Sequence, residues 1–233
     1  MSHLFLFDID LTLIRTPGTG SAAMNDVMAE MIGVADAFAG VDFSGRTDRA
    51  IIRDALRNHG HAPDDAGYEA FLTRFEAVYV PRLEQKLAER GGWLLPGVRE
   101  TLERVTALPD VRVGVATGNF RRAADVKLRY FGLDHYFRDG GFADDAEARA
   151  DLVRIAIRRL GGAVNGGSIF VVGDTSHDIL AALANGAVAV GVATGSSTPE
   201  MLAAVGATHV FDDLSQPDVL LRRLIGDGAS SRS

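Results

Sequence analysis

The chain has 233 residues, of which 47% are hydrophobic and 24% charged, with a net charge of −7 and no cysteine. Since domains commonly run to roughly 100–200 residues, we expect one full domain and a smaller partner. The lack of cysteine excludes disulfides and thiolate metal sites and favours a cytoplasmic location, and the negative charge without a basic cluster argues against a nucleic-acid partner.

The first predicted element is a strand over residues 4–7 that ends on two acids, Asp8 and Asp10. Because an acid interrupts this apolar run and no basic flank precedes it, we expect neither a signal peptide nor a membrane span, and no membrane partner. Alternate residues of an extended backbone share a face, so the two carboxylates are expected to point together and repel each other. Some other group must therefore hold them.

Residues 17–92 carry only helical periodicity, in apolar stripes near 24–31, 51–56 and 68–78. Pro81 is predicted to kink or split the last helix, which Gly91 and Gly92 then end. We expect an all-helical cap domain over 17–92 that interrupts a discontinuous core of residues 1–16 and 93–225. The tail over 226–233 is expected to be disordered.

Apolar runs rich in valine and isoleucine recur after the helical block, and each strong one ends at a turn signal or a polar residue. They alternate with helical patterns, which indicates a parallel sheet covered by helices on both faces. The predicted fold is α/β, a Rossmann-like parallel sheet core with an inserted all-helical cap. The strong predicted strands cover residues 111–116, 169–172 and 188–192, and the weaker ones lie near 141–142 and 208–211.

Polar side chains follow these strands. Thr117 comes after the strand at 111–116, and Asp174 and Asp178 come after the strand at 169–172. The carboxyl ends of parallel strands meet at one edge, where ligands bind, so we expect these groups beside Asp8 and Asp10. Four carboxylates there are mutually destabilising without a cation, and hard oxygen ligands suit Mg²⁺. A divalent ion also lets an anionic nucleophile approach a phosphate.

The stretches DIDLT, ATGN and GDTSHD, in this order and with a helical insertion after the first, resemble the signature motifs of the haloacid dehalogenase-like hydrolase superfamily. Within it, the chain is similar to phosphoglycolate phosphatase-like members with a helical cap. The resemblance implies a phosphoric monoester hydrolase that uses Mg²⁺ and an aspartyl-phosphate intermediate. Its substrate is then a small phosphomonoester, either phosphoglycolate-like or a sugar phosphate.

The resemblance also implies roles for single residues. Asp8 is the expected nucleophile, and Asp10 the general acid that protonates the leaving alcohol and then the base that activates water. Thr117 is expected to donate its hydroxyl to a phosphoryl oxygen, together with the backbone N–H groups of Gly118 and Asn119.

The metal ligands implied in the same way are the Asp8 carboxylate, the Asp10 carbonyl oxygen and Asp174. Asp178 is either a further ligand or the holder of a bound water, and both interpretations stay open. His177 lies inside the same motif and is expected at a helix start or in a hydrogen bond, not in catalysis.

Two positions depart from the family pattern. Leu11 stands where glycine usually follows the second acid, so the loop toward the cap is expected to differ in shape. The lysine that most members carry in the third motif has no counterpart between residues 131 and 160. Arg149 is the expected replacement, because it precedes a predicted helix and keeps the charge. Lys127 is the alternative. It lies about ten residues beyond Thr117, roughly 15 Å along a helix, so we expect it to be too far from the phosphate.

In the predicted cap, the stretch GRTD has two interpretations of equal weight. Arg46 either contacts the non-reacting end of the substrate, or it is exposed while Thr47 or Asp48 serves as an ordinary helix N-cap.

Two other functions use the same residues. A sugar-phosphate mutase of the β-phosphoglucomutase kind shares all the core motifs and returns phosphate to the sugar instead of water. A non-catalytic switch accepts phosphate on Asp8 as a receiver domain does, but receivers lack a helical block after the first acid, so the predicted cap argues against this class.

Overall fold

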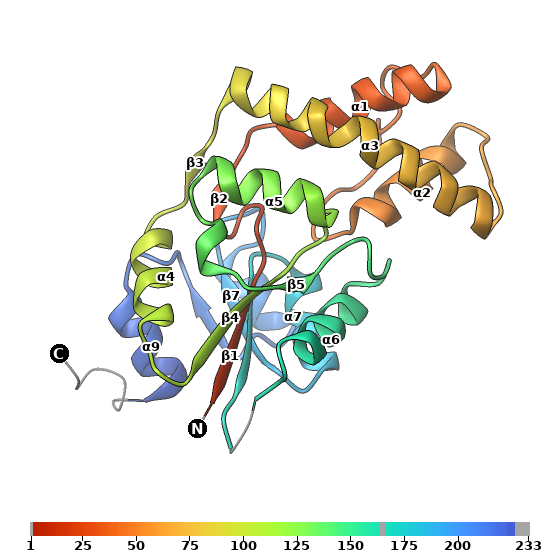
Figure 1. The fold of residues 1–233 in the computed structure, drawn as a ribbon. Helices are drawn as coiled ribbons and strands as arrows, with labels where there is room; N and C mark the ends of the chain where they lie inside the picture. Colours follow the sequence, from red (N-terminus) through yellow and green to blue (C-terminus); the bar gives the residue numbers. More distant parts are fainter. Residues whose placement is uncertain (1, 164–165, 227–233) are drawn as a thin grey trace.

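The computed structural model describes residues 2–163 and 166–226 and contains a central parallel sheet (Figure 1). In these ranges the sheet has six strands, in the order β5-β4-β1-β6-β7-β8. All the predicted strands are present, and the predicted α/β parallel sheet is confirmed. The strands are β1 (His3–Phe7), β4 (Val111–Ala116), β5 (Gly140–Gly141), β6 (Ile169–Gly173), β7 (Val188–Val192) and β8 (His209–Phe211).

Strand β1 lies in the middle of the sheet, where the strand order reverses. The chain passes from β1 to β4 and β5 on one side and later adds β6, β7 and β8 on the other. In open α/β sheets the crevice at this switch point is the place where ligands bind. The acids that follow β1 therefore lie at the favoured position of the fold.

Alternate residues of β1 enter two different cores, one on each face of the sheet. Phe5 and Phe7 pack in a cluster with α4 (Val98–Thr106), α5 (Arg121–Tyr130) and α9 (Pro217–Ile225). Leu4 and Leu6 pack in a second cluster with helices of the other face, which are α6 (Arg149–Arg159), α7 (Ser176–Ala184) and α8 (Pro199–Ala204). This two-sided burial explains why the strand is apolar throughout. A short 3-10 helix, Asp134–Tyr136, follows α5.

Between β1 and β4 the chain forms a helical insertion, at the top of Figure 1, that consists of α1 (Thr19–Ile32), α2 (Asp48–Asn58) and α3 (Asp65–Arg90). It has its own apolar cluster, to which α5 also contributes residues. The segments that lead into and out of it, β2 (Ile14–Arg15) and β3 (Trp93–Leu94), pair with each other in antiparallel fashion. The insertion therefore leaves and rejoins the sheet domain at one place.

Helix α3 runs without a break through Pro81, so Pro81 does not split it, and the alternative that it kinks the helix stays a prediction. A proline inside a helix removes the hydrogen bond to the carbonyl four residues earlier, here that of Ala77. Both residues are exposed, so water can bind this carbonyl. The helix ends at Gly91, where the backbone has a φ of 68° and the N–H bonds to Leu87.

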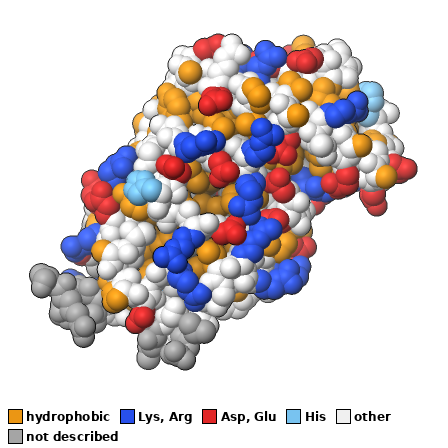
Figure 2. All heavy atoms as spheres, in the orientation of Figure 1, with side chains coloured by type: hydrophobic (Ala, Val, Ile, Leu, Met, Phe, Trp, Pro, Cys, Tyr) orange, Lys and Arg blue, Asp and Glu red, His pale blue; other side chains and the backbone are white. Residues whose placement is uncertain are grey.

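Across the two described ranges, no helix combines the length and the hydropathy needed to cross a membrane. On the face shown in Figure 2, basic and acidic side chains are interspersed. The expected disordered tail falls, apart from Gly226, outside the described residues.

Candidate active site

A cavity of about 640 Å³ lies between the carboxyl edge of the sheet and the helical insertion. Most of the residues predicted at the strand ends line it, whereas Asp178 does not. The sheet side contributes Asp8, Asp10, Thr117, Asn119 and Asp174, and the insertion contributes Met24, Gly45, Arg46, Asp48 and Tyr79.

Three buried acids form a cluster next to this cavity, and two of them, Asp8 and Asp174, line it. Asp8, Asp174 and Asp178 each offer a carboxylate oxygen, and these oxygens lie within 4.8 Å of one another. Thr12 donates to Oδ1 of Asp174 at 3.3 Å, whereas Oδ2 of Asp174 is buried without a hydrogen-bond partner. A buried carboxylate oxygen without a partner is costly unless a cation binds it. The cluster therefore has the composition of a site for a hard divalent cation.

Two acids of this cluster, Asp8 and Asp174, have raised pKa values and hold their protons unusually strongly. Burial raises the pKa of Asp8 to about 7, and neighbouring Asp178 and Asp10 add to the rise while Arg149 opposes it. Burial, with Asp178 and Asp8 as neighbours, raises the pKa of Asp174 to about 8. Both shifts follow from placing like charges together in a poorly solvated place.

Arg149, the expected replacement for the usual lysine, lies beside Asp8 and Asp178. It is the first residue of α6, and one of its guanidinium nitrogens is 2.6 Å from Asp8 and 2.6 Å from Asp178. The same nitrogen donates to the carbonyl of Ala116, the last residue of β4. Arg149 thus links Asp8, which follows β1, to Asp178 in α7.

Asp178 has partners for both carboxylate oxygens. Its Oδ2 accepts from the backbone N–H of Thr175 at 3.1 Å and from the Thr175 hydroxyl at 2.7 Å, in the capping box that begins α7, while Oδ1 lies against Arg149. Of the two acids in this motif, Asp174 is therefore the one with a free oxygen. His177 is exposed in the first turn of α7.

The loop after β4 carries the predicted phosphate-binding residues. The Thr117 hydroxyl is buried and accepts from the Asn119 side-chain amide at 2.7 Å. A Cβ on Gly118 would meet the carbonyl oxygen of Arg46 at 2.2 Å, so only glycine allows the insertion to approach this loop so closely.

Lys127, the alternative to Arg149, lines the cavity, so the expectation that it lies too far away is wrong. Its ammonium lies 2.8 and 2.7 Å from the two carboxylate oxygens of Asp10. The helix begins only at Arg121, which places Lys127 about 9 Å along its axis from that start. Side chains of a helix also lean toward its N-terminus, so the long lysine reaches back to the loop.

The insertion contacts the loop after β4 through Asp48, a contact that was not predicted from the sequence. The N–H of Asp48 donates to the Gly118 carbonyl at 2.7 Å, and its carboxylate accepts from the N–H of Phe120 at 2.9 Å. Thr47 is the N-cap of α2, as one interpretation proposed. Arg46 lines the cavity, but its guanidinium is 2.6 Å from Asp54.

Leu11 has a φ of 59°, and among the described residues it is the one non-glycine residue with a positive φ. This left-handed conformation costs a leucine roughly 1–2 kcal/mol, whereas glycine adopts it freely. Local bonds hold it, because its N–H donates to Ile14 at 2.8 Å and its carbonyl accepts from the Thr194 hydroxyl at 2.5 Å. The backbone therefore takes the shape that glycine favours, although the residue is leucine.

Mg²⁺ is expected to raise the melting temperature, and to raise it more at pH 8 than at pH 6. The pKa values of Asp8 and Asp174 are raised to about 7 and about 8, so without a metal ion the folded chain binds more protons than the unfolded chain between about pH 4 and pH 8. Stability without metal therefore falls as the pH rises through this window. Since Mg²⁺ binds ionised carboxylates, protons compete less at pH 8.

The measurement is the melting temperature in Mg²⁺ minus that in chelator, at both pH values. At a Mg²⁺ concentration about 100-fold above its Kd, binding stabilises the folded chain by about 2.7 kcal/mol. For a chain of this size that raises the melting temperature by several degrees. Asp174→Asn is expected to remove the difference. If Mg²⁺ shifts the melting temperature equally at both pH values, or shifts it in Asp174→Asn as much as in the unchanged protein, then Asp8 and Asp174 do not form the cation site.

A family model described as haloacid dehalogenase-like hydrolase matches residues 5–192 of the chain. A phosphoglycolate phosphatase of Pectobacterium atrosepticum is 27% identical over 234 residues, which cover 96% of this chain and 92% of the relative. The family match thus covers most of the sheet, though not β8, together with the whole insertion and the three acids Asp8, Asp174 and Asp178.

Solved structures share the fold. A hydrolase from Pseudomonas syringae superposes with a TM-score of 0.70 at 23% identity, over 96% of this chain and 99% of the other. A structure described as a putative β-phosphoglucomutase from Thermotoga maritima superposes with a TM-score of 0.62 at 21% identity, over 97% and 100% of the two chains. At these identities the similarity concerns the fold alone.

Proposed function

Since the chain belongs to the haloacid dehalogenase-like hydrolase family and is a phosphatase, we propose that it hydrolyses a small phosphomonoester with Mg²⁺ through an aspartyl-phosphate on Asp8. The observation that carries this proposal is the contact of Arg149 with Asp8 beside the unpartnered oxygen of Asp174. A buried carboxylate flanked by one cation, with ligands for a second, is suited to attack an anionic centre. We also propose a cytoplasmic location, which the lack of cysteine supports.

The reaction has two steps. An Asp8 carboxylate oxygen bonds to phosphorus as the bond to the leaving oxygen breaks, and Asp10 gives its proton to that oxygen. In the second step a water oxygen bonds to phosphorus, Asp10 takes the proton of this water, and the bond to Asp8 breaks. Phosphate leaves, and both side chains return to their first state.

The remaining residues bind the phosphoryl group and the ion. Thr117, Gly118 and Asn119 donate to phosphoryl oxygens, and Arg149 neutralises charge on Asp8 and on the phosphoryl group. The Asp8 carboxylate, the Asp10 carbonyl oxygen and Asp174 hold Mg²⁺, which when bound offsets the negative charge of nucleophile and substrate. Asp178 acts on the ion indirectly, through Arg149 or a bound water.

The helical insertion serves as the cap. Its loop of residues 45–48 covers the loop after β4, and Arg46 on the wall of the cavity is assigned to the non-reacting end of the substrate. Phosphoglycolate and sugar phosphates are the proposed substrate class. Closure of the cap excludes water while the aspartyl-phosphate forms.

The test is a phosphate-release assay over a panel of metabolite monoesters, with Mg²⁺ and with chelator. We expect release from at least one small phosphomonoester, and its loss in chelator. The absence of release from every ester contradicts the proposal. Formation of a sugar-phosphate isomer in place of phosphate identifies the mutase, and a long-lived phosphoprotein without turnover identifies the phospho-acceptor switch.

A further inference from the structure

The ammonium group of Lys127 has three acceptors and no further donor to offer. Its side chain is 5% exposed. Nζ is 2.8 and 2.7 Å from the two oxygens of Asp10 and 2.7 Å from Oδ1 of Asn119. Since an ammonium has three N–H groups, these acceptors use all of them. Lys127 is therefore not placed to bind a phosphoryl oxygen as well.

Asn119 closes the contacts around Lys127 into a ring. Its amide nitrogen donates to Oδ2 of Asp10 at 2.7 Å and to the Thr117 hydroxyl at 2.7 Å. The ring of Asp10, Asn119 and Lys127 joins the loop after β1, the loop after β4 and helix α5. The Asp10 side chain is still 38% exposed and lines the cavity, so the ring orients this carboxylate without covering it.

The position of α5 explains how the ammonium group is buried. Ala124 and Leu128 pack in the core of the sheet, whereas Ala123 and Val126 pack in the core of the insertion. Lys127 therefore has protein on both sides, and in Figure 1 α5 lies between the sheet and α3. A buried ammonium is tolerated only when it is paired and hydrogen-bonded, which the ring provides.

The two buried cations of the site are thus divided between its two catalytic acids. Arg149 contacts Asp8, and Lys127 contacts Asp10. The chain has 24 Lys and Arg residues, and only Lys86 and Lys127 among them are lysines. A lysine is a compact point charge that meets two oxygens of one carboxylate and a third acceptor, unlike the planar fork of arginine.

We propose that Lys127 is a positioning residue that holds the Asp10 carboxylate for both proton transfers. The inference rests on the proposed function, in which Asp10 protonates the leaving oxygen and then accepts a proton from water. Lys127 itself touches neither phosphorus nor the leaving group. Its loss therefore impairs the steps that need Asp10 and spares the attack of Asp8.

The experiment compares Lys127→Met with the unchanged protein on two substrates. One is an alkyl phosphate from the metabolite panel, and the other is p-nitrophenyl phosphate, whose leaving group departs without a proton. On the alkyl ester we expect kcat to fall by about 10²-fold, the scale of general acid–base catalysis, with KM changed less than about threefold.

On p-nitrophenyl phosphate, the first turnover is expected to keep its rate within about threefold while later turnovers slow by about 10²-fold, because only the second step needs Asp10. A burst of nitrophenolate then appears, and the phosphorylated enzyme accumulates. If Lys127→Met only disturbs the structure, the first turnover and the later turnovers slow by the same factor, and the two substrates are affected equally. That result overturns the inference.

Lys86→Met is the matched control. Lys86 pairs with Asp26 at 2.8 Å in the insertion, away from the ring, and this variant is expected to show no burst. If Lys127→Met does not fold, Asp10→Asn is compared with Asp10→Asn/Lys127→Met, which lacks both charges. Equal first-turnover rates in the single and the double variant support the inference. A first-turnover rate about tenfold lower in the double variant overturns it. An unchanged protein without any turnover contradicts the proposed function instead.

Discussion

Replacing Asp8 by Asn is expected to abolish phosphate release, with a fall in kcat of about 10⁴-fold or more, the scale seen when a covalent nucleophile is lost. An amide oxygen is a poor nucleophile toward phosphorus and forms no stable acyl phosphate. The loss is measured as phosphate release in Mg²⁺ on the best substrate of the panel. A trapped aspartyl-phosphate is expected in the unchanged protein and not in this variant.

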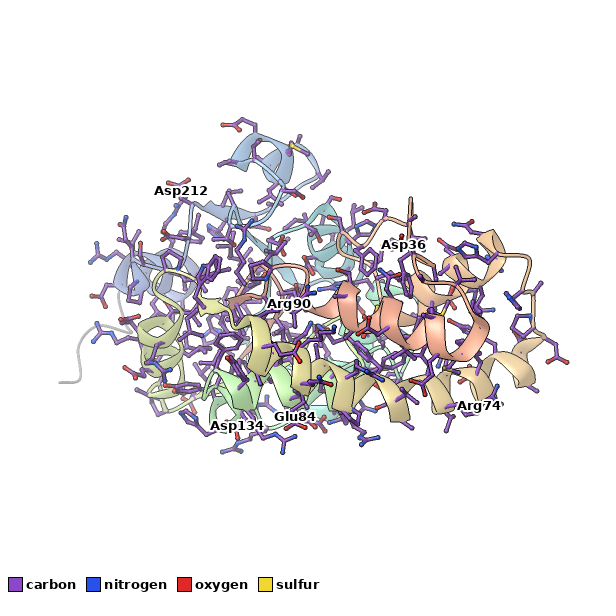
Figure 3. All side chains as sticks on the ribbon, turned by 90° about the horizontal axis from the view of Figure 1, so that it is seen from above. Asp36, Arg74, Glu84, Arg90, Asp134 and Asp212 are labelled. Atoms are coloured by element: carbon purple, nitrogen blue, oxygen red, sulfur yellow. The ribbon has the colours of Figure 1, made fainter. Side chains whose placement is uncertain are left out.

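The fold is expected to survive this substitution. Asn keeps the shape of the side chain and removes one of the crowded acids, and Arg149 retains Asp178 as a partner at 2.6 Å. The melting temperature should therefore stay within a few degrees of that of the unchanged protein. Asp212→Asn is the matched control, since Asp212 is exposed after β8, and Figure 3 shows it at the end of the molecule opposite Arg74. Activity in Asp8→Asn near that of this control contradicts the nucleophile assignment.

Replacing Arg149 by Ala is expected to lower kcat by about 10²–10³-fold, the effect of removing one preorganised group that stabilises transition-state charge. It also leaves Asp8 and Asp178 buried without their shared cation, which costs about 3–5 kcal/mol when one partner of a buried pair is removed. Both kcat and the melting temperature are measured in Mg²⁺. Arg149→Lys is expected to recover part of each loss, because it restores the charge without the fork.

Arg154→Ala provides the comparison for Arg149. Arg154 lies on the same helix, its side chain is 52% exposed, and it pairs with Asp151 one turn away. An exposed pair of this kind contributes at most about 1 kcal/mol, so near-normal turnover and stability are expected. Turnover in Arg149→Ala close to that of Arg154→Ala would show that the cation of the third motif lies elsewhere.

The positions of the strands and of their polar ends could be predicted because they depend on local patterns. A run that is apolar on both faces indicates a buried parallel strand, and the carboxyl ends of such strands meet at one edge. From these two rules follows the meeting of Asp8, Thr117 and Asp174, and the helical periodicity of residues 17–92 adds the place of the insertion. The choice of Arg149 also needed the family resemblance, which calls for a cation in the third motif; its place after a predicted strand and before a predicted helix then favoured it.

Lys127, Asp48 and Leu11 show what local patterns could not supply. Counting residues from Thr117 placed Lys127 too far away, because the count does not show where the helix begins or that α3 and the sheet enclose it. The contact of Asp48 with Phe120 joins elements 72 residues apart in the chain. Leucine disfavours a positive φ, so the residue type at position 11 predicts the opposite of the observed backbone.

The sequence by itself therefore determined the parallel sheet, the inserted helices and the group of acids at the sheet edge, since these follow from periodicity and chain order. The tertiary structure alone decided that Lys127 meets Asp10 and that Arg149 meets Asp178 as well as Asp8. These pairings depend on how α5 and α6 pack against parts of the chain that are distant in sequence. They also depend on which acceptors this packing brings within reach of the N–H donors of Arg149 and Lys127. Long-range packing of this kind leaves no periodic signal in the sequence.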